Sequence, residues 1–434
     1  MRALSTRVPA ALGLLLCPLF SFAQSPGAAA DKGDTAWIIA ATALVLFMTL
    51  PGLALFYAGL VRAKNVLSIL MQCFAITGVV SLIWLAVGYS LIFSDGGAAQ
   101  GFIGGLDKAF LRGVTRDSIS GTIPETLFFM FQMTFAIITP ALVIGGFAER
   151  MRFSAVLGFT ALWLLFVYVP LAHWVWGGGW LAKLGVMDFA GGIVVHVSAG
   201  MAALVCALVM GHRRGFPHTA MTPHSLPLTV AGAGMLWVGW FGFNAGSALA
   251  ANGSAAMAML TTHMGASAGA LAWMAIEWKK YGKPSMLGVV TGMVAGLGTI
   301  TPASGFVGPM GAVVIGLVAG TVCFFATQLL KRKLQIDDSL DVSPVHGVGG
   351  VIGTLMTGVF AAVWLGGVGF PVQKSVVAQV GVQALGVLSA AAWCALVTWL
   401  ILKLLHVAVG LRVAEEHETE GLDLAEHGER GYTP

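Results

Sequence analysis

The sequence predicts an all-α polytopic membrane protein, and three observations point to this fold class. Hydrophobic residues make up 57% of the 434 residues and charged residues only 10%, whereas soluble domains carry roughly one-quarter charged residues. Apolar runs close to the length that spans a bilayer recur along the chain. Lys and Arg gather in alternate connections between these runs, as in membrane proteins of fixed orientation. A soluble globular domain is thereby excluded.

Eleven apolar runs approach the roughly 20 residues that a transmembrane helix needs. They cover residues 36–61, 66–93, 124–147, 153–171, 190–211, 227–250, 255–278, 286–300, 308–330, 343–365 and 377–402. Many are rich in Gly, Ala and Ser, which allow helix backbones to approach closely. We therefore predict eleven tightly packed transmembrane helices in one membrane domain.

The distribution of basic residues predicts the orientation of these helices. If the N-terminus is outside, most Lys and Arg residues fall on the inner side, for example Lys279, Lys280 and residues 331–333. The outer connections hold fewer, among them Lys108 and Lys183. Cytoplasmic loops of membrane proteins carry the excess of positive charge. We therefore expect the chain in the cell inner membrane, with its N-terminus outside and its C-terminus in the cytoplasm.

The first residues are typical of a signal peptide. Arg2 and Arg7 precede a short apolar run, and Ser21-Phe22-Ala23 offers small residues for cleavage. We therefore predict that residues 1–23 are a signal peptide. A first transmembrane helix is the alternative, although the apolar run is too short to span comfortably. A lipoprotein anchor at Cys17 is a third interpretation.

Beyond the signal peptide, residues 24–411 form the predicted membrane domain and residues 412–434 a cytoplasmic tail. Carboxylates dominate the tail, and Gly421 and Gly428 divide it in a way that suggests a structured, regulatory end. The five cysteines lie in apolar stretches or in the signal peptide, without a CxxC pair. They predict neither a disulfide framework nor a metal site.

The fifth and tenth predicted helices each carry a histidine in a glycine-rich setting, VHVSAG around His196 and VHGVGG around His346. Ten of the eleven helices can form two halves of five. Because five is odd, the second half starts from the opposite side of the membrane, and such inverted repeats place a site near the midplane. The two histidines are then symmetry mates, and the final helix stands outside the repeat.

Intramembrane histidines are candidates for function because ionisable groups are costly to bury in a bilayer. A lone buried histidine more often makes a structural hydrogen bond, since neutral imidazole is the least costly ionisable side chain to bury, and this interpretation is kept for His263. His196 and His346 differ, because two neutral imidazoles can share a hydrogen bond and still offer a donor and an acceptor to a small polar solute. They form a candidate proton-handling pair.

Aromatic side chains attract cations most effectively where water is excluded. Phe135, Trp176 and Phe243 are the candidates, although with 13 Trp and 25 Phe in the chain a single aromatic residue is more often lipid-facing or part of the core. Asp188 stands at the outer start of the helix that carries His196. Its simplest role is structural, as a cap that satisfies backbone N–H groups and orients that helix.

Together these motifs resemble the ammonium transporter (Amt/Mep/Rh) family, and in particular its bacterial Amt branch. The resemblance covers nearly the whole mature chain. The motifs are PGLALFYAGLVR (51–62), KNVLS (64–68), FQMTF (131–135), AERMR (148–152), DFAGGIVVHVSAG (188–200), WFGFNAGS (240–247) and DVSPVHGVGG (341–350). The resemblance implies eleven helices in two inverted five-helix halves plus a final helix, assembled as a homotrimer with one pore in each subunit.

The resemblance also implies a substrate and roles for single residues. Carried over by position, these are the pore histidines His196 and His346, the stacked gate Phe135 and Phe243, and the outer cation-recruitment residues Trp176, Ser247 and Phe135. The transported species would be ammonium or ammonia, with methylammonium as an analogue. The acidic tail resembles the family segment that supports docking of a cytoplasmic PII-type signal protein, which blocks the inner mouth when nitrogen is plentiful.

Three alternatives to an ammonium channel are left open. The nearest is a neutral gas channel of the Rh type, although Trp176 favours the Amt branch because Rh proteins generally lack that aromatic cage. The second is an ammonium sensor, although sensor versions carry long cytoplasmic signalling domains. The third is a membrane oxidoreductase with His196 and His346 as axial haem ligands. We expect no enzymatic activity, no cofactor, no metal and no nucleic-acid partner.

Overall fold

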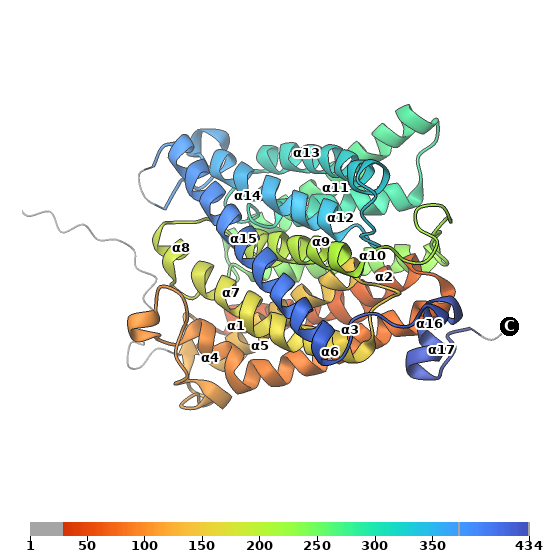
Figure 1. Cartoon of the computed structure of the whole chain (residues 1–434). Coiled ribbons are helices and arrows are strands. Elements are labelled where there is room, and N and C mark those ends of the chain that lie inside the picture. Colours follow the sequence, from red (N-terminus) through yellow and green to blue (C-terminus); the bar gives the residue numbers. More distant parts are fainter. Residues whose placement is uncertain (1–28, 372–373, 433–434) are drawn as a thin grey trace, which may run out of the picture.

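The computed structural model describes residues 29–371 and 374–432. The signal peptide predicted for residues 1–23 lies outside this part of the chain. Within it, long helices run side by side in a layered bundle (Figure 1). The strands of the described chain form one small hairpin, in which β1 (Ile119–Ser120) pairs antiparallel with β2 (Ile123–Pro124). The mainly helical fold class predicted from composition is confirmed.

The helices alternate with short π-helical turns. In chain order the α-helices are α1 (Lys32–Phe47), α2 (Ala54–Leu60), α3 (Val66–Ile83), α4 (Tyr89–Phe93), α5 (Glu125–Val143), α6 (Phe153–Trp163), α7 (Val169–Val175), α8 (Trp180–Lys183), α9 (Ser198–Met210), α10 (Leu226–Gly246), α11 (Gly253–Tyr281), α12 (Met286–Ile300), α13 (Pro309–Gln328), α14 (Val348–Phe360), α15 (Val376–Ala408), α16 (Glu415–Glu420) and α17 (Leu422–His427). The π-helical turns are η1 (Met48–Leu53), η3 (Trp84–Gly88), η7 (Leu164–Tyr168), η8 (Gly192–Val197), η9 (Leu329–Lys333) and η10 (Ser343–Gly347).

Eight continuous helical segments of the described chain are long and apolar enough to cross a membrane. They are Lys32–Leu60, Ala63–Phe93, Glu125–Gly146, Phe153–Lys183, Gly192–Met210, Leu226–Gly246, Pro309–Lys333 and Val376–Ala408. The other three predicted spans fall on α11, on α12 and on η10 followed by α14. These are shorter or richer in small and polar residues, so their apolar signal is weaker. The chain is a multi-pass membrane protein, and the count of eleven spans stays a prediction.

The starts of the long helices follow the capping rules. Asn252 accepts the backbone N–H of Ser254 and Ala255, at 2.9 and 3.1 Å, where α11 begins. Ser285 accepts that of Gly288 at 2.9 Å where α12 begins. These caps satisfy N–H groups that have no partner within the helix. Satisfied helix ends matter most in a bilayer, where water cannot replace the missing partners.

Glycines let three helices of the second half pack at backbone contact. A Cβ atom on Gly269 of α11 would lie 2.5 Å from the carbonyl oxygen of Gly292 in α12. A Cβ atom on Gly320 of α13 would lie 2.3 Å from the carbonyl oxygen of Gly269. Larger residues at these positions would force the helices apart. The small residues of these segments therefore serve close packing, as their composition predicts.

The two helices that carry His196 and His346 also cross at glycine. A Cβ atom on Gly200 would lie 2.2 Å from the Cα atom of Gly347, and one on Gly350 would lie 2.9 Å from the Cβ atom of His196. The start of α9 and the start of α14 therefore meet at van der Waals contact. This crossing brings the two histidines together from positions 150 residues apart in the sequence.

Buried ion pairs join the connections at the predicted cytoplasmic side. Arg213 donates to Glu149 Oε2 at 2.5 Å and to Asp337 Oδ1 at 2.7 Å. Arg62 donates to Glu149 Oε1 at 2.9 Å. Burial alone raises the pKa of Glu149, but Arg213 and Arg62 outweigh it and lower this pKa to about 2. The connections that follow α2, α5, α9 and η9 are thus joined by one charge network.

The acidic tail packs beneath the helices at this same side. Asp423 of α17 accepts the backbone N–H of Leu67 at 3.0 Å and of Ser68 at 2.7 Å, where α3 begins. Glu426 accepts the N–H of Phe153 at 2.9 Å, where α6 begins. Carboxylates are favoured at helix N-termini. Figure 1 shows α16 and α17 against one end of the bundle.

Candidate functional site

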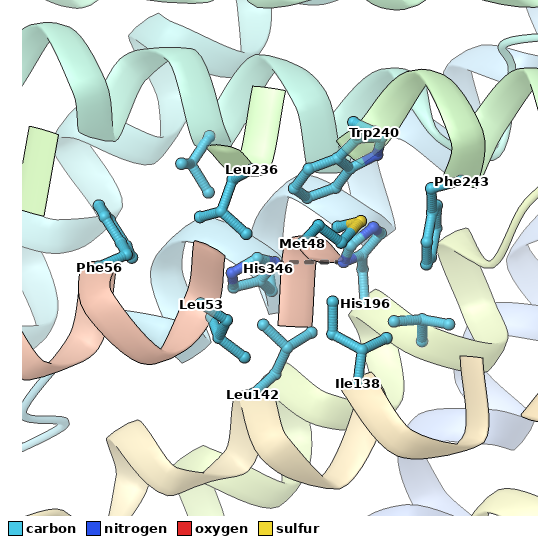
Figure 2. A pocket seen from close by; sticks show the side chains of 12 residues that line it. Met48, Leu53, Phe56, Ile138, Leu142, His196, Leu236, Trp240, Phe243 and His346 are labelled. Carbon is cyan, nitrogen blue, oxygen red and sulfur yellow. Dashed lines mark hydrogen bonds between the residues drawn. The ribbon is translucent and has the colours of Figure 1, made fainter. Parts of the chain in front are cut away.

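A narrow cavity lies in the middle of the bundle between elements of the two halves (Figure 2). Its volume is about 10 Å³, close to the least that one water molecule needs. It is lined by Met48, Leu53, Phe56, Ile138, Leu142, Val195, His196, Leu236, Trp240, Phe243, Val294 and His346. The ionisable side chains among them are the two histidines. A small neutral solute fits this space, whereas an unpaired ion would be strongly disfavoured.

His196 and His346 face each other in this cavity. Their Nδ1 atoms are 3.1 Å apart, and the ring planes differ by 17°. Both side chains are buried, with exposures of 1% and 4%. An Nδ1–Nδ1 hydrogen bond requires one donor and one acceptor, so the pair shares a single proton along this contact. Nε2 of His196 is buried and has no hydrogen-bond partner among the described residues, and it is therefore available to a solute.

Asp188 holds the start of η8, the π-helical turn that carries His196. Its carboxylate accepts four backbone N–H groups, those of residues 191–194, at 2.7, 2.6, 2.8 and 3.2 Å in chain order. Gly191 has φ of +114°, a conformation suited to glycine, and this lets the chain turn around the carboxylate. The direction of the His196 side chain is thus fixed by a buried carboxylate and a glycine turn.

Two phenylalanines stack beside the histidine pair. The ring centroids of Phe135, on α5, and Phe243, on α10, are 4.2 Å apart with an interplanar angle of 25°. Phe243 also contacts His196, with ring centroids 6.3 Å apart. Both phenylalanines are about 1% exposed. The stack therefore closes the cavity at the end opposite Phe56, as Figure 2 shows for Phe243.

Trp176 lies on the other side of this stack. Its ring stands edge-on to Phe135, with centroids 5.9 Å apart and an angle of 87°. The indole N–H donates to the carbonyl oxygen of Asp188 at 3.0 Å, which fixes the ring. The Ser247 hydroxyl donates to the carbonyl of Phe243 at 2.9 Å, so its oxygen is left as an acceptor. The structure thus brings the sequence-predicted aromatic residues into one row that leads to the histidines.

Trp240 is a cavity residue that the sequence did not single out. It stacks on His196 with centroids 5.6 Å apart and an angle of 18°, and its Nε1 donates to Thr301 Oγ1 at 2.9 Å. Its position three residues before Phe243 puts both on one helix face, and this spacing is the signal that could have found it. Met48 and Phe56 carry no comparable signal, because apolar residues are everywhere in these helices.

The interpretation of His263 as a buried, hydrogen-bonded histidine is wrong. Its side chain is exposed on the surface of α11. It packs beside Trp237 and Phe241, with ring centroids 5.3 and 6.3 Å away, and its imidazole makes no hydrogen bond to the described residues. The sequence could not distinguish the two faces of α11, because small residues occur all round this helix.

The haem alternative does not fit this geometry. The imidazoles of His196 and His346 are in direct hydrogen-bond contact at 3.1 Å, which leaves no room for an iron atom between them. The cavity, of about 10 Å³, is far smaller than a porphyrin. Among the described residues no group of three or more His, Cys, Asp and Glu is arranged to hold a metal ion.

The apolar helices, the buried imidazole pair and the aromatic row beside it define the class of multi-pass membrane transport proteins, here with a small apolar cavity at the centre. Residues 36–432 match the profile of the Ammonium Transporter Family. The chain belongs to this family, and the resemblance seen in its motifs is confirmed.

The similarity to known members extends over nearly the whole chain. The ammonium transporter of Aquifex aeolicus is 48% identical over 427 residues, which are 97% of this chain and 98% of that protein. The ammonium transporter of Bacillus subtilis is 46% identical over 93% of this chain and 99% of that protein. These relatives are transporters and not enzymes.

Solved structures have the same fold. The crystal structure of Saccharomyces cerevisiae Mep2 matches with a TM-score of 0.80 and 38% identity, over 90% of this chain and 92% of that one. A structure described as a sensor Amt protein matches with a TM-score of 0.84 and 32% identity, over 91% of this chain and 98% of that one.

Proposed function

We propose that the protein transports ammonium or ammonia across the inner membrane, through the cavity that holds His196 and His346. Membership of the ammonium transporter family supports the substrate. The observation that carries the mechanism is the order of side chains: an aromatic pair stacked at 4.2 Å, followed by imidazoles in hydrogen-bond contact at 3.1 Å. A cation can be held on the outer side of the aromatic pair, whereas only a neutral molecule is favoured beside the imidazoles.

Recruitment takes place outside the phenylalanine stack. Ammonium loses water when it arrives, and the faces of Trp176 and Phe135 replace part of that hydration by cation–π attraction. The Ser247 oxygen, whose own proton is engaged with Phe243, accepts one N–H of the ammonium. Sodium has no hydrogen to donate to this oxygen, so the site favours ammonium.

Deprotonation takes place near the Phe135–Phe243 gate. Beyond the gate the walls are apolar except for the histidines and the indole nitrogen of Trp240, and an unpaired charge there is very unfavourable. Ammonia passes instead, as a molecule that both donates and accepts hydrogen bonds. The unpartnered Nε2 of His196 and the His346 imidazole supply the matching groups.

The protein surface supports assembly as a homotrimer. His263 and its neighbour Trp237 lie on α11 and α10, and an ionisable side chain in a spanning helix seldom faces lipid. A second copy packed over this face would cover the exposed His263 side chain, in keeping with the trimer that the family resemblance implies. Cross-linking in native membranes tests this assembly.

The tail supports regulation from the cytoplasm. With the N-terminus outside and the C-terminus inside, α16 and α17 lie at the inner mouth, where Asp423 and Glu426 cap two membrane helices. A PII-type signal protein would find this ordered surface next to the pores. Co-purification of the chain with the PII protein of its own cell tests the partnership.

An ammonium sensor is a second candidate, because a sensor Amt protein is among the matched structures. A Rh-type neutral gas channel is disfavoured by Trp176, whose ring standing against Phe135 suits a cation. A sensor would bind ammonium at the same outer site while passing little of it.

Current measurement on a solid-supported membrane tests the proposed function. Proteoliposomes are given a pulse of ammonium, and matched liposomes without protein and a sodium pulse serve as controls. We expect a transient current with ammonium alone. Swelling of the same proteoliposomes in ammonia is measured in parallel. Rapid swelling without a current would indicate a neutral gas channel. Neither a current nor rapid swelling would indicate a sensor.

A further inference from the structure

The last long helix of the described chain, α15, runs across one face of the bundle (Figure 1) and carries two buried glutamines. Gln379 and Gln383 are both fully buried, and a spacing of four residues puts them on one face of the helix. A buried amide is costly unless its hydrogen bonds are made. Both side chains therefore have to be paired, and most of the groups that pair with them lie in the segment just before Asp188.

Gln383 binds both peptide groups of Met187. Its Oε1 accepts the Met187 N–H at 2.8 Å, and its Nε2 donates to the Met187 carbonyl at 2.7 Å. Nε2 also donates to the carbonyl of Thr354 on α14 at 3.0 Å, and Oε1 also accepts from Gln379 Nε2 at 3.1 Å. Because a backbone N–H only donates and a carbonyl only accepts, these partners fix the orientation of the amide. The hydrogen-bonding capacity of the Gln383 side chain is thus fully used.

Met187 directly precedes the residue that holds two parts of the candidate site. The carbonyl of Asp188 accepts the indole N–H of Trp176 at 3.0 Å, and its carboxylate caps the turn η8. The rigid peptide plane that contains the Met187 carbonyl ends at the Asp188 Cα atom, so a displacement of Met187 also displaces Asp188. Gln383 is therefore connected to the Trp176 ring through two residues of backbone.

The surroundings of Met187 offer no substitute for the Gln383 amide. Met187 is 2% exposed, so its peptide groups would stay buried and unpaired if the amide were lost, which is unfavourable. One turn further along α15, a Cβ atom on Gly386 would lie 3.0 Å from the side chains of Ile193 and Val186. This glycine lets α15 pack closely on both sides of the Asp188 turn. The segment around Asp188 thus depends on α15 for its position.

We propose that Gln383 is a positioning residue for ammonium recruitment, because it fixes the backbone of Met187 and Asp188 and thereby the ring of Trp176. This inference rests on the proposed function, in which Trp176 holds the cation outside the phenylalanine stack. Gln383 does not line the cavity. Without its amide the hydrogen bond that holds the indole weakens, and the ring leaves the place where its face meets the cation. The affinity of the outer site falls, while the path past the histidines is unchanged.

Ammonium-pulse currents over a concentration series test this role. Gln383→Met keeps nearly the length and volume of the side chain and removes the amide. It should raise the half-saturation concentration about fivefold, less than complete loss of the cation–π contact would, and should change the maximal rate much less. Thr398→Val is the matched control, because Thr398 is a buried residue of α15 that accepts the indole N–H of Trp163 at 3.0 Å. It removes a buried hydrogen bond of the same helix and should leave the half-saturation concentration unchanged.

A combination of two replacements tests whether Gln383 acts through Trp176. In a Trp176→Leu background, Gln383→Met should have almost no further effect on the half-saturation concentration, because the effects of residues that act as one unit do not add. Equal fold-changes in both backgrounds would overturn the positioning role. An unchanged concentration in Gln383→Met, or an equal rise in Thr398→Val, would overturn it as well.

Where Gln383→Met fails to reach the membrane, Gln383→Asn decides the question, because its amide is one methylene too short to bind both peptide groups of Met187. A rise that disappears in the Trp176→Leu background supports the role, and an unchanged concentration refutes it. If Trp176→Leu raises the concentration and the Gln383 variants do not, the positioning role alone fails. If Trp176→Leu itself leaves the concentration unchanged, recruitment at this ring fails and the positioning role falls with it.

Discussion

At the scale of single residues, the proposed mechanism makes Trp176 the residue that selects a cation over a neutral molecule. Its ring stands 5.9 Å from Phe135 and is held by a hydrogen bond to the Asp188 carbonyl. In this proposal the preference for ammonium arises at the outer site, before the substrate reaches the histidines. The histidine pair then conducts the molecule that the outer site has selected.

Replacement of Trp176 by Leu should raise the half-saturation concentration for ammonium about thirtyfold, because a desolvated cation–π contact contributes roughly 2 kcal/mol. The maximal rate should change much less, since the path beyond the gate is untouched. Ammonium-pulse currents over a concentration series measure both quantities. An unchanged half-saturation concentration would rule out a recruiting role for this ring.

Asp188 should be needed for folding more than for binding. Asp188→Ala leaves four buried N–H groups without acceptors, and we expect a clear drop in the melting temperature, from a loss of about 2 kcal/mol or more. Asp188→Asn should fall between this variant and the wild type, because its amide oxygen still accepts. Melting of the detergent-solubilised protein, followed by tryptophan fluorescence, checks the order. Equal melting temperatures for all three would contradict the capping role.

The residues of the candidate site could be predicted from the sequence where their residue type is rare in apolar helices. His196 and His346 stand out because ionisable side chains are scarce in these helices, and Asp188 stands out for the same reason. Trp240 was missed because the chain has many aromatic residues, and only its spacing of three residues from Phe243 distinguishes it from the others. The prediction for His263 was wrong because a rare residue type draws attention to a position but does not show which side of the helix the side chain lies on.

At the scale of elements, the crossing of α9 and α14 sets the distance between the histidines. Gly200→Leu should abolish transport and reduce the yield of folded protein, because its Cβ atom would lie 2.2 Å from the backbone of Gly347. Overpacking of this kind costs about 3 kcal/mol or more where backbone is struck. Gly78→Leu on α3, where nothing lies within 4 Å, is the control. Normal transport by Gly200→Leu would contradict the packing described here.

The inner charge network should resist mild acid. The pKa of Glu149 is lowered in the folded protein to about 2, from a reference of 4.5. A lowered carboxyl pKa stabilises the fold fully above the reference value, and this contribution, of about 3 kcal/mol, is lost only as pH falls from there toward 2. The melting temperature of the wild type should therefore exceed that of Glu149→Gln at pH 7 and at pH 5.5. The gap should shrink below pH 4, and a gap already closed at pH 5.5 would refute the assignment.

The elements were predictable to different degrees. Apolar length located the spans, because the bilayer imposes it. The π-helical turns left no mark in the sequence, since their residues are as apolar as those of the α-helices around them. The partners of Arg213 were equally hidden, because Glu149 and Asp337 lie 64 and 124 residues away in the chain.

At the scale of the whole molecule, the two halves share one plan but differ at their ends. In the first half the Asp188 carboxylate accepts four backbone N–H groups, and Trp176 belongs to the same half, whereas Ser247 follows α10 of the second half. In the second half Asp338, eight residues before His346, accepts the N–H of Ser343 at 2.6 Å. A mainly apolar cavity of about 10 Å³ lies between the two halves, around the imidazole pair. In the proposed mechanism, ammonia passes this pair.

Uptake of labelled methylammonium by proteoliposomes containing His346→Ala tests most directly whether the substrate passes the imidazole pair. His263→Ala is the matched control, because it removes an imidazole from a long helix of the bundle outside the cavity. We predict that His346→Ala reduces uptake by about tenfold or more, since a passing ammonia molecule loses a hydrogen-bonding partner in an apolar cavity, while His263→Ala transports at the wild-type rate. Wild-type uptake by folded His346→Ala protein would contradict the account.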